Sequence, residues 1–268
     1  MPAVVHVSYP ATNVGLVVID NPPKNFGTPE LAARIMEGLA AAGEAECRVC
    51  VVASDTPGYF IAHWSLQSII DAQGAAPDRV NYRPREPGFF DAIEAMPMIV
   101  IAANNGQAWG GGSEFSWSCD LRIAGESATY GQPEVALGII PGGGGTTRLA
   151  RLVGPTKCME LIVDGRPITA GQALAIGAIN RVVPDGQLRE ESIRWAAHIA
   201  GWPAWALAAC KRSLVEGRDL PLAAARRNEG QVFREVSRRE DALQLMREAQ
   251  TKYDAGADSY AAIGLPRP

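Results

Sequence analysis

The chain has 268 residues, of which 47% are hydrophobic and 20% are charged. A chain of this length and composition can bury one large core, or one core with a smaller appended region. The formal net charge is −4, and the arginines within 226–239 alternate with glutamates, as on a solvated helix face. This pattern gives no electrostatic support for binding nucleic acid.

The five cysteines are few, scattered and odd in number: Cys47, Cys50, Cys119, Cys158 and Cys210. Such a set is typical of free thiols in a reducing compartment. Cys47 and Cys50 form a C-x-x-C, but no second pair accompanies them, so two core thiols are favoured over a redox or metal site. The N-terminus lacks a basic region followed by an apolar stretch, and no apolar run reaches about 18 residues. We therefore expect a cytoplasmic protein that is not bound to membranes and holds no metal.

Apolar runs rich in β-branched residues predict buried strands along the first two thirds of the chain. The predicted strands are 14–19, 49–54, 98–103, 121–124, 128–130 and 178–183. Apolar residues at helical spacing predict helices between them, at 31–42, 112–118, 144–152, 157–164 and 170–176. Continuous apolar strands separated by helices predict an α/β fold with a parallel sheet.

Two further segments have a different character. Residues 71–89 are polar, contain prolines and glycines and lack periodicity, which predicts a mobile surface connection. From 187 to 250 the chain is rich in Ala, Arg, Glu and Leu at helical spacing, which predicts a helical C-terminal part with a loosely ordered tail beyond Gly256. We therefore expect a core over 1–195 and a helical region over 196–268.

Three glycines and a glutamate occur together in the stretch GQAWGGGSEF, residues 106–115. A predicted strand leads into Gly110–Gly112, and a predicted helix follows. Backbone N–H groups at a helix start, unshielded by side chains, can bind an anion or a polarised carbonyl oxygen. Glu114 lies in the first helical turn, where the helix dipole favours its ionised form and burial opposes it.

A second carboxylate, Glu134, lies in the stretch GQPEVALGIIPGGGGTTRL, 131–149. The four glycines at 142–145 indicate either a tight turn or close approach of a ligand, and the residues alone leave both open. A phosphate loop is disfavoured because Thr146, Thr147 and Arg148 stand where a lysine and a hydroxyl residue would follow. If Glu114 and Glu134 share a pocket, their mutual repulsion can separate their proton affinities, which suits acid and base chemistry next to a carbonyl. Spacing alone does not establish that they converge.

The segment 110–154 closely resembles the enoyl-CoA hydratase/isomerase (crotonase) family. It contains three glycines, one residue and Glu114, then Cys-Asp, Gly-Gln-Pro-Glu134 and Pro-Gly-x-Gly-Gly-Thr. A weaker likeness covers about 14–183. The resemblance implies a crotonase-like spiral of repeated ββα units, with C-terminal helices that support a homotrimer or a dimer of trimers. It also implies an acyl-CoA substrate and no prosthetic group, so that coenzyme A enters only as part of the substrate.

The resemblance further implies the roles of individual residues. The N–H of Gly111 would form one half of an oxyanion hole for the thioester carbonyl. Retention of both Glu114 and Glu134 favours hydration of the C2–C3 double bond, with Glu114 activating water and Glu134 supplying the proton to the α carbon. The remaining substrate or CoA contacts would come from Phe26, Ala62, His63, Ser65, Leu66, Gly110 and Pro133. Trp109 and Trp117 are either acyl-pocket walls or ordinary core aromatics.

The second half of the oxyanion hole departs from the family pattern, which reads approximately Phe-x-Ala-Gly-x-Asp-Leu. This chain has FIAHWSL at 60–66. His63 replaces the glycine and Ser65 the aspartate, and by register Trp64 supplies the donor N–H. Because the donor is a backbone group, the indole does not remove it, and Ser65 can still cap a helix. His63 is either an added acid or base or a packing residue.

These departures keep other functions open. One is a different crotonase-type reaction: double-bond isomerisation, C–C hydrolysis or a biosynthetic lyase reaction. Another is an acyl-CoA-binding protein without catalysis, although a protein that only binds would not need two desolvated carboxylates.

Overall fold

The computed structural model describes residues 4–74 and 88–267. The chain divides into two compact units, unit 1 (Met1–Ala204) and unit 2 (Trp205–Pro268). The predicted boundary at 195 would cut helix α8 (Leu188–Ala200), whereas the observed boundary leaves α8 whole within unit 1.

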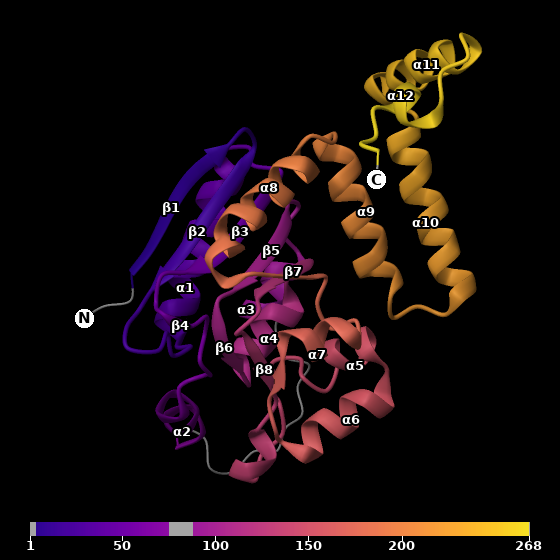
Figure 1. Cartoon of the computed structure of the whole chain (residues 1–268). Coiled ribbons are helices and arrows are strands. Elements are labelled where there is room, and N and C mark those ends of the chain that lie inside the picture. The colour runs from indigo at the N-terminus through magenta and orange to yellow at the C-terminus, as the bar shows by residue number, and fades with distance from the viewer. Residues whose placement is uncertain (1–3, 75–87, 268) are drawn as a thin grey trace. The chain divides into compact units, whose positions relative to one another are not determined.

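The larger sheet of unit 1 has six strands among the described residues. In spatial order they are β1 (Val4–Ala11), β2 (Val14–Asp20), β3 (Val49–Ser54), β5 (Ile99–Asn104), β7 (Leu121–Gly125) and β10 (Arg181–Val183). All neighbours pair in parallel except β1 and β2. The predicted α/β fold with a parallel sheet is therefore confirmed (Figure 1).

The smaller sheet consists of short strands, in the order β4 (Gly58–Tyr59), β6 (Gly106–Trp109), β8 (Thr129–Gly131) and β9 (Ile168–Thr169). The first three pair in parallel, and β9 is antiparallel to β8. Each successive turn of the chain supplies one strand to the larger sheet and then one strand to the smaller sheet. The pairs are β3 and β4, β5 and β6, and β7 and β8. These turns give the repeated ββα arrangement predicted from the resemblance.

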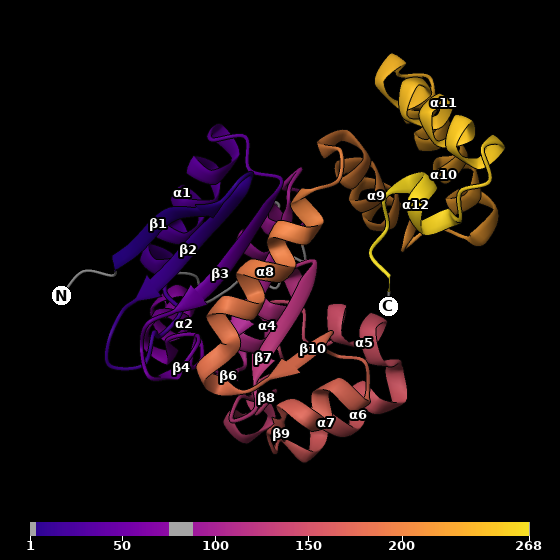
Figure 2. The ribbon, with the colours of Figure 1, turned by 45° about the horizontal axis from the view of Figure 1, so that its top comes forward.

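Helices cover both faces of the larger sheet. On one face, Leu188 and Ala196 of α8 pack against Val14 and Val49. On the other, α1 (Pro29–Glu44) packs Leu31 and its buried neighbours against β2 and β3. Figure 2 shows α8 crossing in front of the sheet. Because alternate side chains of a strand point to opposite faces, a strand buried on both faces is apolar at nearly every position.

Unit 1 contains further helices within the described ranges. They are α2 (Leu66–Gly74), α3 (Phe89–Glu94), α4 (Gly111–Ser118), η1 (Glu134–Leu137), α5 (Arg148–Val153), α6 (Pro155–Asp164), α7 (Ala170–Ala175) and η2 (Asp185–Gln187). Helix α2 extends into the segment 71–89 that was predicted as a connection, and residues 75–87 lie outside the described ranges. Cys47, Cys50, Cys119 and Cys158 are buried free thiols.

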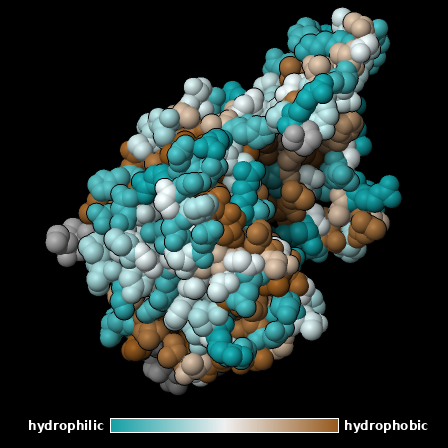
Figure 3. Space-filling model, in the orientation of Figure 1, coloured by the Kyte–Doolittle hydropathy of each residue, from teal (hydrophilic) through white to brown (hydrophobic). Residues whose placement is uncertain are grey.

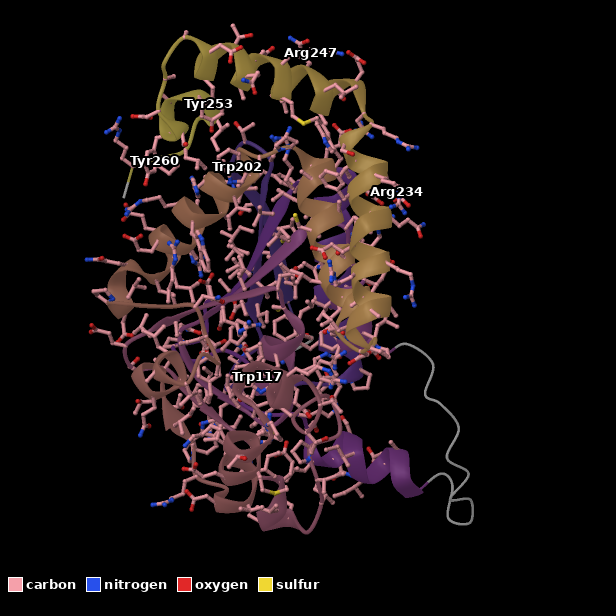
Figure 4. All side chains as sticks on the ribbon, turned by 90° about the vertical axis from the view of Figure 1, so that its right-hand side faces the viewer. Trp117, Trp202, Arg234, Arg247, Tyr253 and Tyr260 are labelled. Carbon is pink, nitrogen blue, oxygen red and sulfur yellow. The ribbon has the colours of Figure 1, made fainter. Side chains whose placement is uncertain are left out.

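Unit 2 is helical, as predicted. It contains α9 (Ala204–Gly217), α10 (Leu222–Ser237), α11 (Glu240–Asp254) and α12 (Ser259–Ile263). The prediction of a loosely ordered tail is wrong, because Asp258 caps α12 by accepting a hydrogen bond from the Ala261 N–H. Arg234 on α10 and Arg247 on α11 are exposed (Figure 4), in agreement with a solvated charged face.

Candidate active site

Helix α4 begins where β6 ends, and glycines make that junction. Gly110 precedes the helix with φ 49°, a value that favours glycine. At Gly112 a Cβ would lie 1.9 Å from the Ile61 carbonyl oxygen, so only glycine lets the helix start approach the 60–64 loop this closely. The glycine run therefore serves close packing of two backbone segments.

Two backbone N–H groups meet at this junction. A Cβ placed on Gly111 would lie 3.3 Å from the Trp64 backbone nitrogen and 2.8 Å from the Trp64 Cβ. Within the described ranges, neither the Gly111 N–H nor the Trp64 N–H donates a hydrogen bond to a protein group. Backbone N–H groups without acceptors are donors that can bind an oxygen atom of a ligand.

The loop that carries Trp64 is fixed from both sides. The Phe60 N–H donates to the Gln107 carbonyl, and the Trp109 N–H donates to the Ala62 carbonyl, at 3.1 and 3.0 Å. Across the loop, the Gly27 N–H donates to the His63 carbonyl at 2.8 Å. The loop thus keeps regular backbone pairing although His63 occupies the position of the family's glycine.

The substituted residues of this loop have local partners. His63 Nδ1 lies 2.8 Å from the Trp64 carbonyl oxygen, and the His63 ring packs on Phe26 at 4.8 Å between centroids. Ser65 Oγ accepts a hydrogen bond from the Ser68 N–H, as predicted for a cap of α2. These contacts are consistent with a packing role for His63. Leu66, the first residue of α2, is 41% exposed. Hydrophobic surface is visible at the lower left of Figure 3, where Figure 1 draws α2 in the same orientation.

Glu114 is held by the glycine loop at 142–145. Its Oε1 accepts hydrogen bonds from the Gly143 N–H at 2.6 Å and the Gly145 N–H at 2.9 Å. The loop thus turns the chain and directs its N–H groups to a side chain of the same chain. Close approach of a ligand to this loop stays a prediction. Burial raises the pKa of Glu114, and the N–H groups and the Arg148 charge oppose that rise.

Arg148 joins the glycine loop to α3. Its guanidinium donates to the Gly143 carbonyl at 2.9 Å, to Asp91 at 2.5 Å and to Glu94 at 2.9 Å. The loop is therefore fixed at its carbonyl side by Arg148 and at its N–H side by Glu114. This role of Arg148 was not predicted from the sequence, because its carboxylate partners Asp91 and Glu94 lie more than 50 positions away.

Glu134 begins η1, directly after Pro133, and is 9% exposed. A Cβ on Gly110 would lie 2.9 Å from Glu134 Oε1, so this carboxylate lies against the start of α4. Ser113 ties the two segments together, since its hydroxyl donates to the Ala108 carbonyl and accepts from the Gly131 N–H. The Glu134 carboxylate thus lies at the start of α4, next to Gly110, whereas the Glu114 carboxylate contacts the separate glycine loop at Gly143 and Gly145.

The Glu114 charge acts on Glu134. Burial, with a smaller contribution from the Glu114 charge, raises the pKa of Glu134 to about 7. A carboxyl group with a pKa near neutrality can donate or accept a proton at physiological pH.

Aromatic side chains enclose the Trp64 side of the site. Trp64 packs on Phe89 and Phe90 of α3, with centroids 6.2 and 5.9 Å apart, and Phe89 stacks on Phe115 of α4. Trp117 lies inside unit 1 (Figure 4) and stacks on Tyr130. Sequence analysis did not identify Phe89 or Phe90, because they lie at the edge of the segment predicted as a connection.

Two negative findings concern the described residues. No group of three or more His, Cys, Asp or Glu side chains in residues 4–74 and 88–267 is arranged to hold a metal ion. None of the helices in those ranges combines the length and hydrophobicity needed to cross a bilayer.

Comparison with protein families gives one match over most of the chain. The sequence model of the family described as enoyl-CoA hydratase/isomerase matches residues 10–254. A probable mitochondrial enoyl-CoA hydratase 2 of Arabidopsis thaliana is 37% identical over 74% of this chain and 65% of its own length. The 2,3-dehydroadipyl-CoA hydratase of Escherichia coli K12 is 34% identical over 75% of this chain and 77% of its own. Further relatives from Dictyostelium discoideum and Rhizobium meliloti are matched over only 48% and 55% of their lengths.

Solved structures agree with the sequence comparison. The crystal structure of an enoyl-CoA hydratase from Bacillus anthracis superposes with a TM-score of 0.81 at 30% identity, covering 92% of this chain and 96% of that one. The crotonase-like fold expected from the resemblance is therefore confirmed.

Proposed function

Because the chain belongs to the enoyl-CoA hydratase/isomerase family, we propose that it is a hydro-lyase that adds water across the C2–C3 double bond of an enoyl-CoA thioester. The proposal is supported by two buried carboxylates, Glu114 and Glu134, that lie close enough for the charge of Glu114 to act on Glu134. It is further supported by the N–H groups of Gly111 and Trp64, which have no acceptor among the described residues. The substrate is an acyl-CoA, and no prosthetic group takes part in the proposed reaction.

In the proposed reaction the thioester carbonyl oxygen accepts hydrogen bonds from the Gly111 and Trp64 N–H groups. As the water oxygen bonds to C3, the electron pair of the double bond moves toward the carbonyl, and the two donors stabilise the resulting enolate. One such donor contributes roughly 3 kcal/mol to transition-state stabilisation.

The proton transfers are divided between the glutamates. Glu114 accepts the proton of the attacking water, and Glu134 donates a proton to C2. This assignment is supported by the surroundings of the two groups. Burial raises the pKa of both groups, but at Glu114 two backbone N–H groups and the Arg148 charge oppose that rise, whereas the pKa of Glu134 reaches about 7, which leaves it partly protonated at neutral pH. The two groups titrate as a coupled pair. Before the next turnover Glu114 releases the proton that it took from water, and Glu134 takes up a proton.

Replacement of either glutamate tests this proposal. We expect Glu114→Gln and Glu134→Gln each to lower the rate of crotonyl-CoA hydration by a factor on the order of 10² to 10⁴, since each loses one proton transfer. Glu126→Gln serves as the control, because Glu126 is an exposed glutamate of unit 1. This variant should hydrate crotonyl-CoA at the rate of the unaltered protein. Unchanged turnover in both active-site variants would remove the proposal.

The altered loop at 60–66 motivates a second candidate within the family: isomerisation, C–C hydrolysis or a biosynthetic lyase reaction. Incubation with a panel of acyl-CoAs and analysis of products by mass spectrometry separates these cases. If 2-enoyl-CoAs are the only substrates and each product is 18 mass units heavier than its substrate, the reaction is hydration. Products of unchanged mass with a shifted double bond support isomerisation. Tight binding without any product would indicate a protein that only binds acyl-CoA.

The remaining proposals concern assembly and location. We propose a homotrimer or a dimer of trimers that unit 2 helps to form, with no nucleic-acid or membrane partner. A cytoplasmic location is also a proposal, and two of the relatives are named mitochondrial.

A further inference from the structure

Gln132 lies between Trp117 and Glu134 and is 2% exposed. One terminal atom of its amide is 3.1 Å from the Trp117 indole nitrogen, and the other is 3.1 Å from both carboxylate oxygens of Glu134. Each end of this buried amide thus faces one specific group.

The chemistry of those groups determines which way the amide faces. An indole N–H can only donate a hydrogen bond, so the amide atom facing it must be the oxygen. The NH2 group then faces Glu134. We propose that Trp117 is a positioning residue: its indole N–H fixes the Gln132 amide so that the NH2 group faces the Glu134 carboxyl in both of that carboxyl's protonation states.

The surroundings restrict both side chains. Trp117 is 5% exposed and stacks on Tyr130, with ring centroids 5.2 Å apart. Gly145 leaves no spare room beside Gln132, since a Cβ there would lie 2.8 Å from the Gln132 Cδ. The amide therefore has little freedom to move to other partners, and its orientation depends on Trp117 and Glu134.

Several other charged or titratable groups lie around Glu134. Glu114 of α4 is the nearby carboxylate, and Arg148 of α5 interacts with Glu114. Helix α6, which packs against η1, carries Lys157 paired with Glu160. In addition, Arg166 pairs with Asp164, and the Tyr130 hydroxyl belongs to the ring stacked on Trp117. The donors to the Glu134 carboxylate are the Gln132 amide, 3.1 Å from both carboxylate oxygens, and the backbone N–H of Glu134 itself.

A fixed donor favours the ionised carboxyl over the neutral one. Ionised Glu134 accepts from the NH2 group, whereas the O–H of protonated Glu134 finds no acceptor in an amide that cannot turn. Without the indole N–H, the amide is free to turn and accept that O–H, which stabilises the protonated form. Loss of the indole N–H should therefore raise the pKa of Glu134 further. The importance of this effect for turnover rests on the proposed function, but the effect itself does not.

The test is a carboxyl titration that needs no substrate. In protein labelled with 13C at glutamate side chains, the Glu134 resonance is identified by its loss in Glu134→Gln and followed with pH by NMR. Trp117→Phe keeps an aromatic ring and removes the N–H, and we expect it to raise the pKa of Glu134 by about half a unit or more. Trp109→Phe is the matched control, because its indole donates to Thr129 at 3.1 Å instead, and the titration should stay in place.

A second variant shows whether Trp117 acts through Gln132. Gln132→Met removes the amide and should also raise the pKa of Glu134, and adding Trp117→Phe to it should cause no further shift. An unshifted titration in Trp117→Phe, an equal shift in Trp109→Phe, or additive shifts in the double variant would each overturn the proposal. Loss of hydratase activity in every enoyl-CoA assay, with the titration shifts present, would instead remove only the proposed function.

Discussion

The two glutamates of the site differ in the groups that compensate for their burial. Glu114 accepts two backbone N–H bonds from the glycine loop and lies within reach of the Arg148 charge. Glu134 lies beside the Gln132 amide, and the Glu114 charge contributes to raising its pKa. Two carboxyl groups in one site can therefore hold their protons differently, which is what an acid and base pair requires.

The raised pKa of Glu134 has a consequence for stability. The group titrates near pH 7 in the folded protein and near 4.5 when unfolded, so between these values the folded state binds more protons. The free energy of unfolding then falls as pH rises through this interval. Glutamine does not ionise, and we expect the Tm of Glu134→Gln to exceed that of the unaltered protein increasingly from pH 5 to pH 8.

Calorimetry over that pH range measures the difference. Glu126→Gln, at an exposed position, should show no such trend. A Tm difference for Glu134→Gln that stays constant with pH would contradict the raised pKa.

At the scale of elements, the site depends on the loop between η1 and α5. A Cβ on Gly143 would lie 2.3 Å from the Phe90 ring and 2.7 Å from Glu114 Oε2, whereas a Cβ on Gly142 would meet nothing within 4 Å. We expect Gly143→Ala to displace the loop from Glu114 and to lower the hydration rate at least about tenfold. Gly142→Ala, one position away, should retain the rate, and equal rates in the two variants would show that the loop's contact with Glu114 is unimportant.

The sequence predicted the buried strands and most helices well, because their apolar patterns are local. The predicted helix at 112–118 corresponds to α4, and that at 157–164 to α6. Strands β1, β4, β6 and β9 were not predicted. Strand β1 is exposed along most of its length and contains Pro10, and the other three are short and hydrogen-bonded to segments distant in sequence.

The candidate site residues could be named from the sequence where they form part of a known family motif. The contacts that support them could not. Glu114, Glu134 and Gly111 stand in one continuous stretch that resembles a known family. The supporting residues Gln132 and Arg148 stand in the same stretch, but their roles depend on contacts that spacing does not reveal. Catalytic function of the site residues remains a prediction.

At the scale of the molecule, unit 2 exposes large hydrophobic side chains on its helices. Leu214, Leu222 and Phe233 are 74%, 77% and 65% exposed. Hydrophobic surface of this kind is typical of an interface. We expect light scattering to give a mass three or six times that of one chain, and Phe233→Glu to shift the distribution toward smaller species. A single-chain mass at micromolar concentration would contradict the proposed assembly.

The central claim is that one substrate carbonyl is bound between the N–H groups of positions 64 and 111 with both carboxylates facing its double bond. A crystal structure of Glu134→Gln with a bound enoyl-CoA tests it most directly. We expect a thioester oxygen within about 3 Å of both nitrogens, with C2 and C3 next to residues 134 and 114. A thioester bound elsewhere, or one that contacts neither nitrogen, would contradict it.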